Sequence, residues 1–119
     1  MFEFQSTRTI KWRGGKPDLD CLVRLFIESV PPGFKKFFDE HKYFRILYRD
    51  RNEAVLGSNL KNLEVRFYLL RREDASGAVF LILVLHNLNV IGGIQSVFLR
   101  YIFAAMVRST LRRMNVPFI

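Results

Sequence analysis

Cysteine is almost absent from this chain, and histidine is scarce. The 119 residues include one cysteine, Cys21, and two histidines, His41 and His86. A disulfide within the chain, a cysteine zinc site and a Cys-x-x-Cys redox pair are excluded, because each needs at least two cysteines. The two histidines lie on different segments, and neither has neighbours at the spacing of a metal site. We therefore expect no metal and no cofactor.

Motifs for catalysis are also missing. No G-x-S-x-G sequence is present, and the glycines before Lys16 do not form a phosphate loop, because Pro17 removes an amide donor and the G-x-x-x-x-G-K pattern is absent. Asp18 and Asp20 suit the start of a helix better than an acid pair. Cys21, on that helix, is expected to be packing material and not a reactive thiol. We predict that the protein is not an enzyme, with no catalytic residues and no small-molecule substrate.

Acidic residues are outnumbered, with 11 against 19 basic ones, which gives a formal net charge of +8 and a pI of about 10.2. Such an excess favours polyanionic partners such as RNA, DNA or acidic lipid. An ordinary basic surface is the alternative interpretation. Half of the residues are apolar, which suffices for one core, so residues 1–119 are predicted to form a single domain.

A secretory signal and an Arg/Ser-rich presequence are not recognisable, so an import address would be uncleaved or already removed. Residues 79–107 are apolar enough to raise the question of a membrane span. His86, Gln95 and Arg100 interrupt them, and an arginine at the bilayer centre costs about 2.5–3.5 kcal/mol. We therefore predict no transmembrane span.

The first half of the chain predicts a strand, a helix and a short helical segment. Residues 2–12 alternate with β-branched character, which is typical of a strand. Asp18 is a suitable N-cap, and apolar residues at helical spacing run from there to Val30, where Pro31 ends the helix. Residues 33–41 are expected to add a short helical turn.

The second half predicts three strands and a final helix. Residues 43–49 and 63–70 alternate, with Phe44, Ile46 and Tyr48 expected on one face of the former, and residues 78–85 form an apolar run expected to be covered on both faces. Residues 52–60 are interpreted as a break. The expected order is βαβββα, an α/β fold with a thioredoxin-like mixed sheet and helices packed on it.

The last helix, residues 93–114, carries more apolar residues than one buried stripe requires. We expect Ile94, Val97, Phe98, Tyr101, Ile102 and Ala105 to face the core. Leu99 and Phe103, on the other side, are then expected to be covered by a neighbouring protein.

Basic residues cluster in three places: around the first strand and its turn, in the middle of the chain, and at the end of the last helix. Lysine and arginine make sequence-independent contacts with phosphates, and interleaved aromatic rings can stack on unpaired bases. The predicted RNA-binding residues are Lys11, Trp12, Arg13, Lys16, Arg45, Arg49, Arg51, Arg112 and Arg113.

Several stretches resemble a thioredoxin-like family shared by mitochondrial ribosomal proteins and a small accessory subunit of respiratory complex I. The similar stretches are residues 10–15 (IKWRGG), 23–28 (VRLFIE), 44–49 (FRILYR), 55–56 and 60–62. The resemblance implies a non-catalytic scaffold that has the fold without the redox cysteines. Charge then favours a structural subunit of a mitochondrial ribosome in the matrix, bound to rRNA and to neighbouring proteins. The alternatives are a complex I accessory subunit, or a freestanding nucleic-acid-binding protein, possibly viral, in the cytoplasm or nucleus of a host cell.

Overall fold

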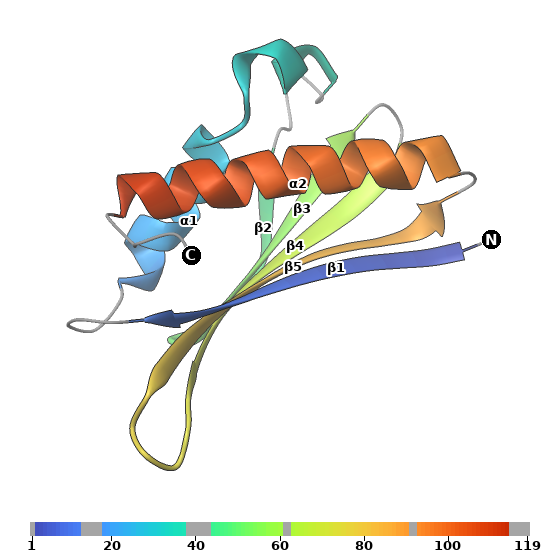
Figure 1. Cartoon of the computed structure of the whole chain (residues 1–119). Coiled ribbons are helices and arrows are strands. Elements are labelled where there is room, and N and C mark those ends of the chain that lie inside the picture. The colour runs from blue at the N-terminus through green and yellow to red at the C-terminus, as the bar shows by residue number, and fades with distance from the viewer. Residues whose placement is uncertain (1, 13–17, 38–43, 61–62, 91–92, 115–119) are drawn as a thin grey trace.

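Four strands that follow one another along the chain pair as neighbours, and the first strand joins them at one edge (Figure 1). The computed structural model describes residues 2–12, 18–37, 44–60, 63–90 and 93–114. The sheet has the order β1-β5-β4-β3-β2, with every pairing antiparallel. The strands are β1 (Phe2–Trp12), β2 (Arg45–Arg49), β3 (Glu53–Leu60), β4 (Leu63–Glu73) and β5 (Val79–Val90).

The α/β class is confirmed, but two expectations about the sheet are wrong. All the described pairings are antiparallel, so the sheet is not mixed, and the order of elements is βαββββα instead of βαβββα. The additional strand is β3, whose residues were interpreted as a break because Asn52, Gly57 and Ser58 are turn formers. Gly57 has a packing role: a Cβ on it would lie 3.0 Å from Cδ1 of Leu47. A thioredoxin-like topology is not confirmed.

Helix α1 (Leu19–Glu28) begins and ends close to where the sequence predicts. The Asp18 carboxylate accepts a hydrogen bond from the backbone N–H of Asp20 at 3.0 Å, as an N-cap does. Leu22 and Phe26 are fully buried beneath the helix. A 3₁₀ helix, Pro32–Phe37, follows and overlaps the predicted helical segment, and residues 38–41 of that prediction lie outside the described residues.

Helix α2 (Gly93–Arg113) has the predicted bounds to within one residue, but only part of its predicted buried stripe faces the core. Ile102 is buried and Phe98 packs against the core, as expected. Its buried side chains are Leu99, Ile102, Phe103, Met106, Val107, Thr110 and Leu111. Val97 and Tyr101, which were expected in the core, are 68% and 64% exposed. Leu99 and Phe103 are therefore core residues and not a partner surface. None of the described helices is long and apolar enough to cross a membrane, which agrees with the prediction.

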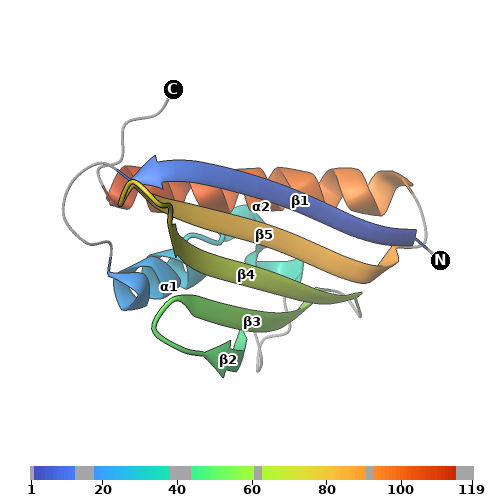
Figure 2. The ribbon, with the colours of Figure 1, turned by 90° about the horizontal axis from the view of Figure 1, so that it is seen from below.

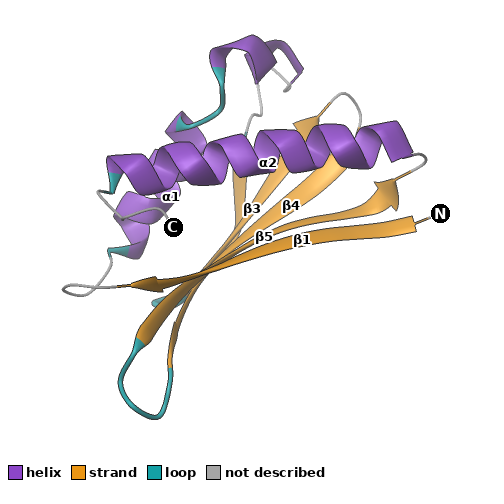
Figure 3. Cartoon of the chain, in the orientation of Figure 1, coloured by secondary structure: helices purple, strands orange, loops and turns teal. Residues whose placement is uncertain are grey.

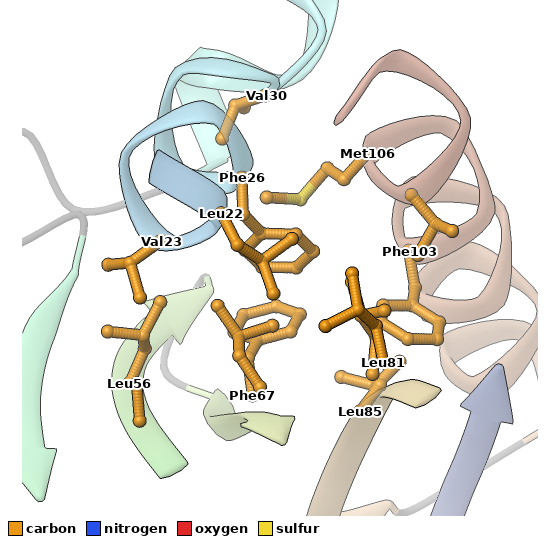
Figure 4. Close-up of a cluster of buried hydrophobic side chains, with 14 of the residues drawn as sticks. Leu22, Val23, Phe26, Val30, Leu56, Phe67, Leu81, Leu85, Phe103 and Met106 are labelled. Carbon is orange, nitrogen blue, oxygen red and sulfur yellow. The ribbon is translucent and has the colours of Figure 1, made fainter. Parts of the chain in front are cut away.

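Both helices pack on one face of the sheet, and the core lies between these two layers (Figures 3 and 4). Three aromatic rings join the layers: the Phe26 ring centroid lies 5.2 Å from that of Phe67 and 6.4 Å from that of Phe103. From β5, Leu81, Leu83 and Leu85 point into this core and are fully buried. Burying large apolar side chains contributes about 1.5–3 kcal/mol each, so this layer is the main source of stability.

Candidate nucleic-acid interface

The sheet face opposite the helices is not covered by any described element (Figure 2). Directly paired residues of antiparallel strands place their side chains on the same face, so the register defines this surface. Its four rows of paired residues are Gln5–His86–Arg66–Gly57–Arg45, Thr7–Val84–Tyr68–Val55–Tyr48, Thr9–Ile82–Leu70–Glu53 and Lys11–Phe80–Arg72. We call these residues the open sheet face. Because it is uncovered, the expectation that β5 is enclosed on both faces is wrong.

Aromatic rings lie in the middle of the open sheet face. Tyr68 on β4 and His86 on β5 have ring centroids 6.2 Å apart and are both half-buried. Phe80 is half-buried one row beyond Ile82, and Tyr48 on β2 is 51% exposed. Part of each ring is therefore available to a ligand. Such rings on a sheet surface suit stacking with unpaired bases, which every base permits through its π-face.

Cationic side chains surround this aromatic centre. Arg66 and Arg45 lie in the first row, and Lys11 and Arg72 lie in the last row, near the β4–β5 turn. Within the four rows the one carboxylate is Glu53, which lies 3.9 Å from the Arg72 guanidinium. Around the rows lie Glu64, Asp50, which accepts from the Tyr48 hydroxyl, and Asp74, which interacts electrostatically with Lys11. The face therefore combines a net positive charge with aromatic surface.

The structure brings two of the predicted RNA-binding residues, Lys11 and Arg45, onto the open sheet face. Arg49 lies on the helix side, where its Nη2 contacts the Asp20 carboxylate at 2.6 Å. Arg51 is exposed in the turn after β2. Arg112 and Arg113 lie in the last turn of α2, and Nη1 of Arg113 is 3.4 Å from the Glu28 carboxylate. The predicted residues therefore do not form one continuous surface.

Trp12 lies on the other side of the sheet from Lys11. Its side chain is half-buried on the helix side and packs against the core, because it pairs with Val79 in the same alternation as Ile10. Trp12 is therefore not part of the open sheet face, and its contact with RNA stays a prediction. Arg13 and Lys16 lie outside the described residues.

Sequence reasoning missed the centre of the open sheet face. The alternation of residues 63–70 does place Arg66 and Tyr68 on the side opposite Val65 and Phe67, and the structure confirms this. What was missing is the register that sets His86 directly beside Arg66.

In β2, a bulge at Leu47 puts Ile46 and Tyr48 on opposite faces, so the expectation that they share a face is wrong. A bulge of one residue inverts the faces of everything after it.

Tyr48 is held at the edge of this surface by a hydrogen bond from its hydroxyl to the Asp50 carboxylate at 3.0 Å. Asp50 also accepts from the backbone N–H of Asn52 at 2.7 Å, and this bond is the main reason that the pKa of Asp50 is lowered. The bond to Asp50 in turn raises the pKa of the Tyr48 phenol.

We expect Tyr48→Phe to move the pKa of Asp50 part of the way back toward the ordinary value of about 3.9, because the Asn52 donor remains. A carboxyl with a lowered pKa stabilises the fold above its unfolded pKa, and this contribution is lost as pH falls through the folded value. An NMR titration of the Asp50 carboxyl carbon measures the change, with Tyr68→Phe as the control. An unchanged Asp50 pKa in Tyr48→Phe contradicts the assignment.

Among the residues that the structure describes, no group of three or more His, Cys, Asp or Glu side chains is placed to hold a metal ion. The chain is an α/β domain, and its candidate site is the open face of the antiparallel sheet, which is basic and aromatic. No protein-family model, curated protein sequence or solved structure matches this chain.

Proposed function

We propose that this chain is a non-catalytic RNA-binding subunit and that the open sheet face is its RNA-contacting surface. The observation that carries the proposal is the arrangement of Lys11, Arg45 and Arg66 around the Tyr68–His86 ring pair on an uncovered sheet. Cations bind the phosphates, and the rings accept unstacked bases, so single-stranded RNA is the form that fits. Duplexes expose few base faces, and the described residues supply no helix projecting from this face.

The proposal also names the larger complex in which the chain would bind RNA. The resemblance described above implies a structural subunit of a mitochondrial ribosome in the matrix, and the net charge of +8 supports an rRNA partner. A thioredoxin-like topology remains a prediction from the same resemblance. A complex I accessory subunit is the second candidate, and it predicts protein contacts with no RNA affinity.

The test is titration of a fluorescent 12-nucleotide single-stranded RNA with the full chain at several salt concentrations. The double variant Lys11→Ala/Arg66→Ala is expected to weaken binding and to reduce the slope of log K against log salt by about 1.4, because each lost phosphate contact on a single strand contributes about 0.7. Tyr68→Leu is expected to cost about 1–3 kcal/mol for each base that it stacks.

Matched controls lie on α2 and on the 3₁₀ helix, on the other side of the sheet. Lys35→Ala/Arg108→Ala removes the same charge, and Tyr101→Leu removes the same kind of ring. If the control pair weakens binding as much as the pair on the open sheet face, the affinity comes from net charge alone and the assigned surface is wrong. If the unaltered chain does not bind the RNA at all, the proposal fails.

A further inference from the structure

The outer edge of β2 is the second surface of interest, and it shares Arg45 and Tyr48 with the open sheet face. The sheet formed by the described residues ends at β2, so one side of its backbone has no neighbouring strand (Figure 2). All five residues of β2 are exposed, and three of them are large and apolar or aromatic: Ile46 at 59%, Leu47 at 38% and Tyr48 at 51%. Unpaired edges with exposed apolar residues are templates for an added strand.

A groove of about 400 Å³ runs between this edge and α1. Its apolar lining residues are Val23, Ile27 and Ile46, and its polar ones are Arg24, Glu28 and the Arg49–Asp20 pair. Ile46 faces the groove because the bulge at Leu47 leaves it on the helix side of the sheet. A strand added beside β2 would place alternate side chains under α1, so one large apolar side chain would enter this groove.

Charge indicates the chemistry of the partner. The two carboxylates of the groove are already paired, Asp20 with Arg49 at 2.6 Å and Glu28 with Arg113 at 3.4 Å. Among the described residues, Arg24, Arg45 and Arg51 have no ion pair, and all three side chains are exposed around this edge. A second copy of the chain would bring like charges together, since each copy carries +8.

We propose that β2 and α1 form a docking site for an extended acidic peptide segment of a partner protein. The segment adds to the sheet at β2 and inserts an apolar side chain between Val23, Ile27 and Ile46. Its carboxylates alternate to the other face of the sheet, where they pair with Arg45. In this mode of recognition, main-chain hydrogen bonds supply affinity and the groove selects the side chain.

The probe is a synthetic peptide, Glu-Val-Glu-Phe-Glu-Val-Glu, capped at both ends and titrated into the full chain while backbone amide shifts are recorded. We expect saturable binding with the largest shifts at Arg45–Arg49 and along α1. A peptide with lysine in place of glutamate, and one of the same composition with its apolar residues grouped together, are expected to bind at least tenfold more weakly.

Two matched variants test the groove. Ile46→Ser is expected to weaken binding at least tenfold, whereas Val97→Ser, at a residue of similar exposure on α2, leaves it unchanged. Both positions are more than half exposed, so both variants are expected to fold, which circular dichroism checks.

Three results would overturn the proposal. The first is absence of saturable binding by the peptide. The second is binding that single-stranded RNA displaces and that maps to the open sheet face, which would assign the affinity to the RNA surface. The third is a dimer in sedimentation that Ile46→Ser abolishes, which would assign the edge to a second copy. Loss of RNA binding in Lys11→Ala/Arg66→Ala without loss of peptide binding separates the two proposals.

Discussion

Replacing Phe103 with alanine is expected to lower the free energy of unfolding by about 3–5 kcal/mol. The Phe103 side chain is 1% exposed, and its ring stacks on that of Phe67 with centroids 6.3 Å apart. Because α1 and β4 also supply rings to this cluster, removal of Phe103 leaves a cavity that its neighbours fill only in part. Since native domains are stable by about 5–15 kcal/mol, this one substitution removes a large share. Urea denaturation followed by circular dichroism measures it.

Tyr101→Ala is the matched control, two residues earlier on the same helix. The Tyr101 side chain is 64% exposed and contacts the Phe34 ring with centroids 5.6 Å apart, so its loss is expected to cost about 1 kcal/mol or less. Both variants replace an aromatic residue of α2 with alanine, so the change in helix propensity is nearly the same in the two and does not account for a difference between them. If Tyr101→Ala destabilises the chain more than Phe103→Ala, α2 presents the other stripe to the sheet and the orientation described above is wrong.

Asn87→Leu is expected to lower the free energy of unfolding by about 1–3 kcal/mol, although leucine is similar in size and more apolar. The Asn87 side chain is 1% exposed, and its Nδ2 donates to the backbone carbonyl of Glu64 at 3.0 Å. Leucine removes this donor, so the part-buried carbonyl oxygen of Glu64 loses a hydrogen-bond partner. The bond joins β5 to β4 through a side chain, so the loss also loosens this end of the pair. Denaturant unfolding again measures the change.

Gln5→Leu is the control for this substitution. Gln5 is an exposed amide on β1, opposite His86, so the same chemical change there is expected to alter stability by no more than about 0.5 kcal/mol. Equal losses for the two variants would mean that leucine is unfavourable in both strands for reasons unrelated to the Glu64 carbonyl.

Local patterns predict most of the elements of this fold. β1 and α2 have the expected bounds to within a residue, and the Asp18 cap starts α1 where the sequence indicates. β3 is missed because Gly57 and Ser58 interrupt an otherwise apolar stretch. The space beside Gly57 is taken by the Leu47 side chain of the neighbouring strand β2, a contact that the local sequence does not reveal. The buried stripe on α2 is predicted only in part, with Ile102 buried as expected and Tyr101 exposed. Apolar residues surround that helix, so more than one face satisfies the helical period.

The candidate interface was predictable only in fragments. The charge and alternation of residues 63–70 place Arg66 and Tyr68 on one solvent-facing side. Lys11 is predicted as an RNA-binding residue because basic residues cluster around the first strand. The sequence does not reveal that β1 pairs with β5, which is what brings Lys11 beside Phe80 and completes the surface. Register between strands far apart in the sequence depends on tertiary packing, which a local pattern does not contain.

The pairing of β1 with β5 also governs how the chain can fold. Trp12 lies opposite Val79 and Phe2 opposite Val90, so β1 has no partner until α1, the strands β2 to β4 and β5 itself have been synthesised. Closing so long a loop is entropically costly and slows folding, whereas the β2-to-β5 hairpins close over short distances and can form first. During translation, at about 5–20 residues per second, β1 therefore remains an unpaired strand for seconds. A chain that ends before β5 leaves β1 without its neighbour, so the protein cannot be divided into two halves that fold separately.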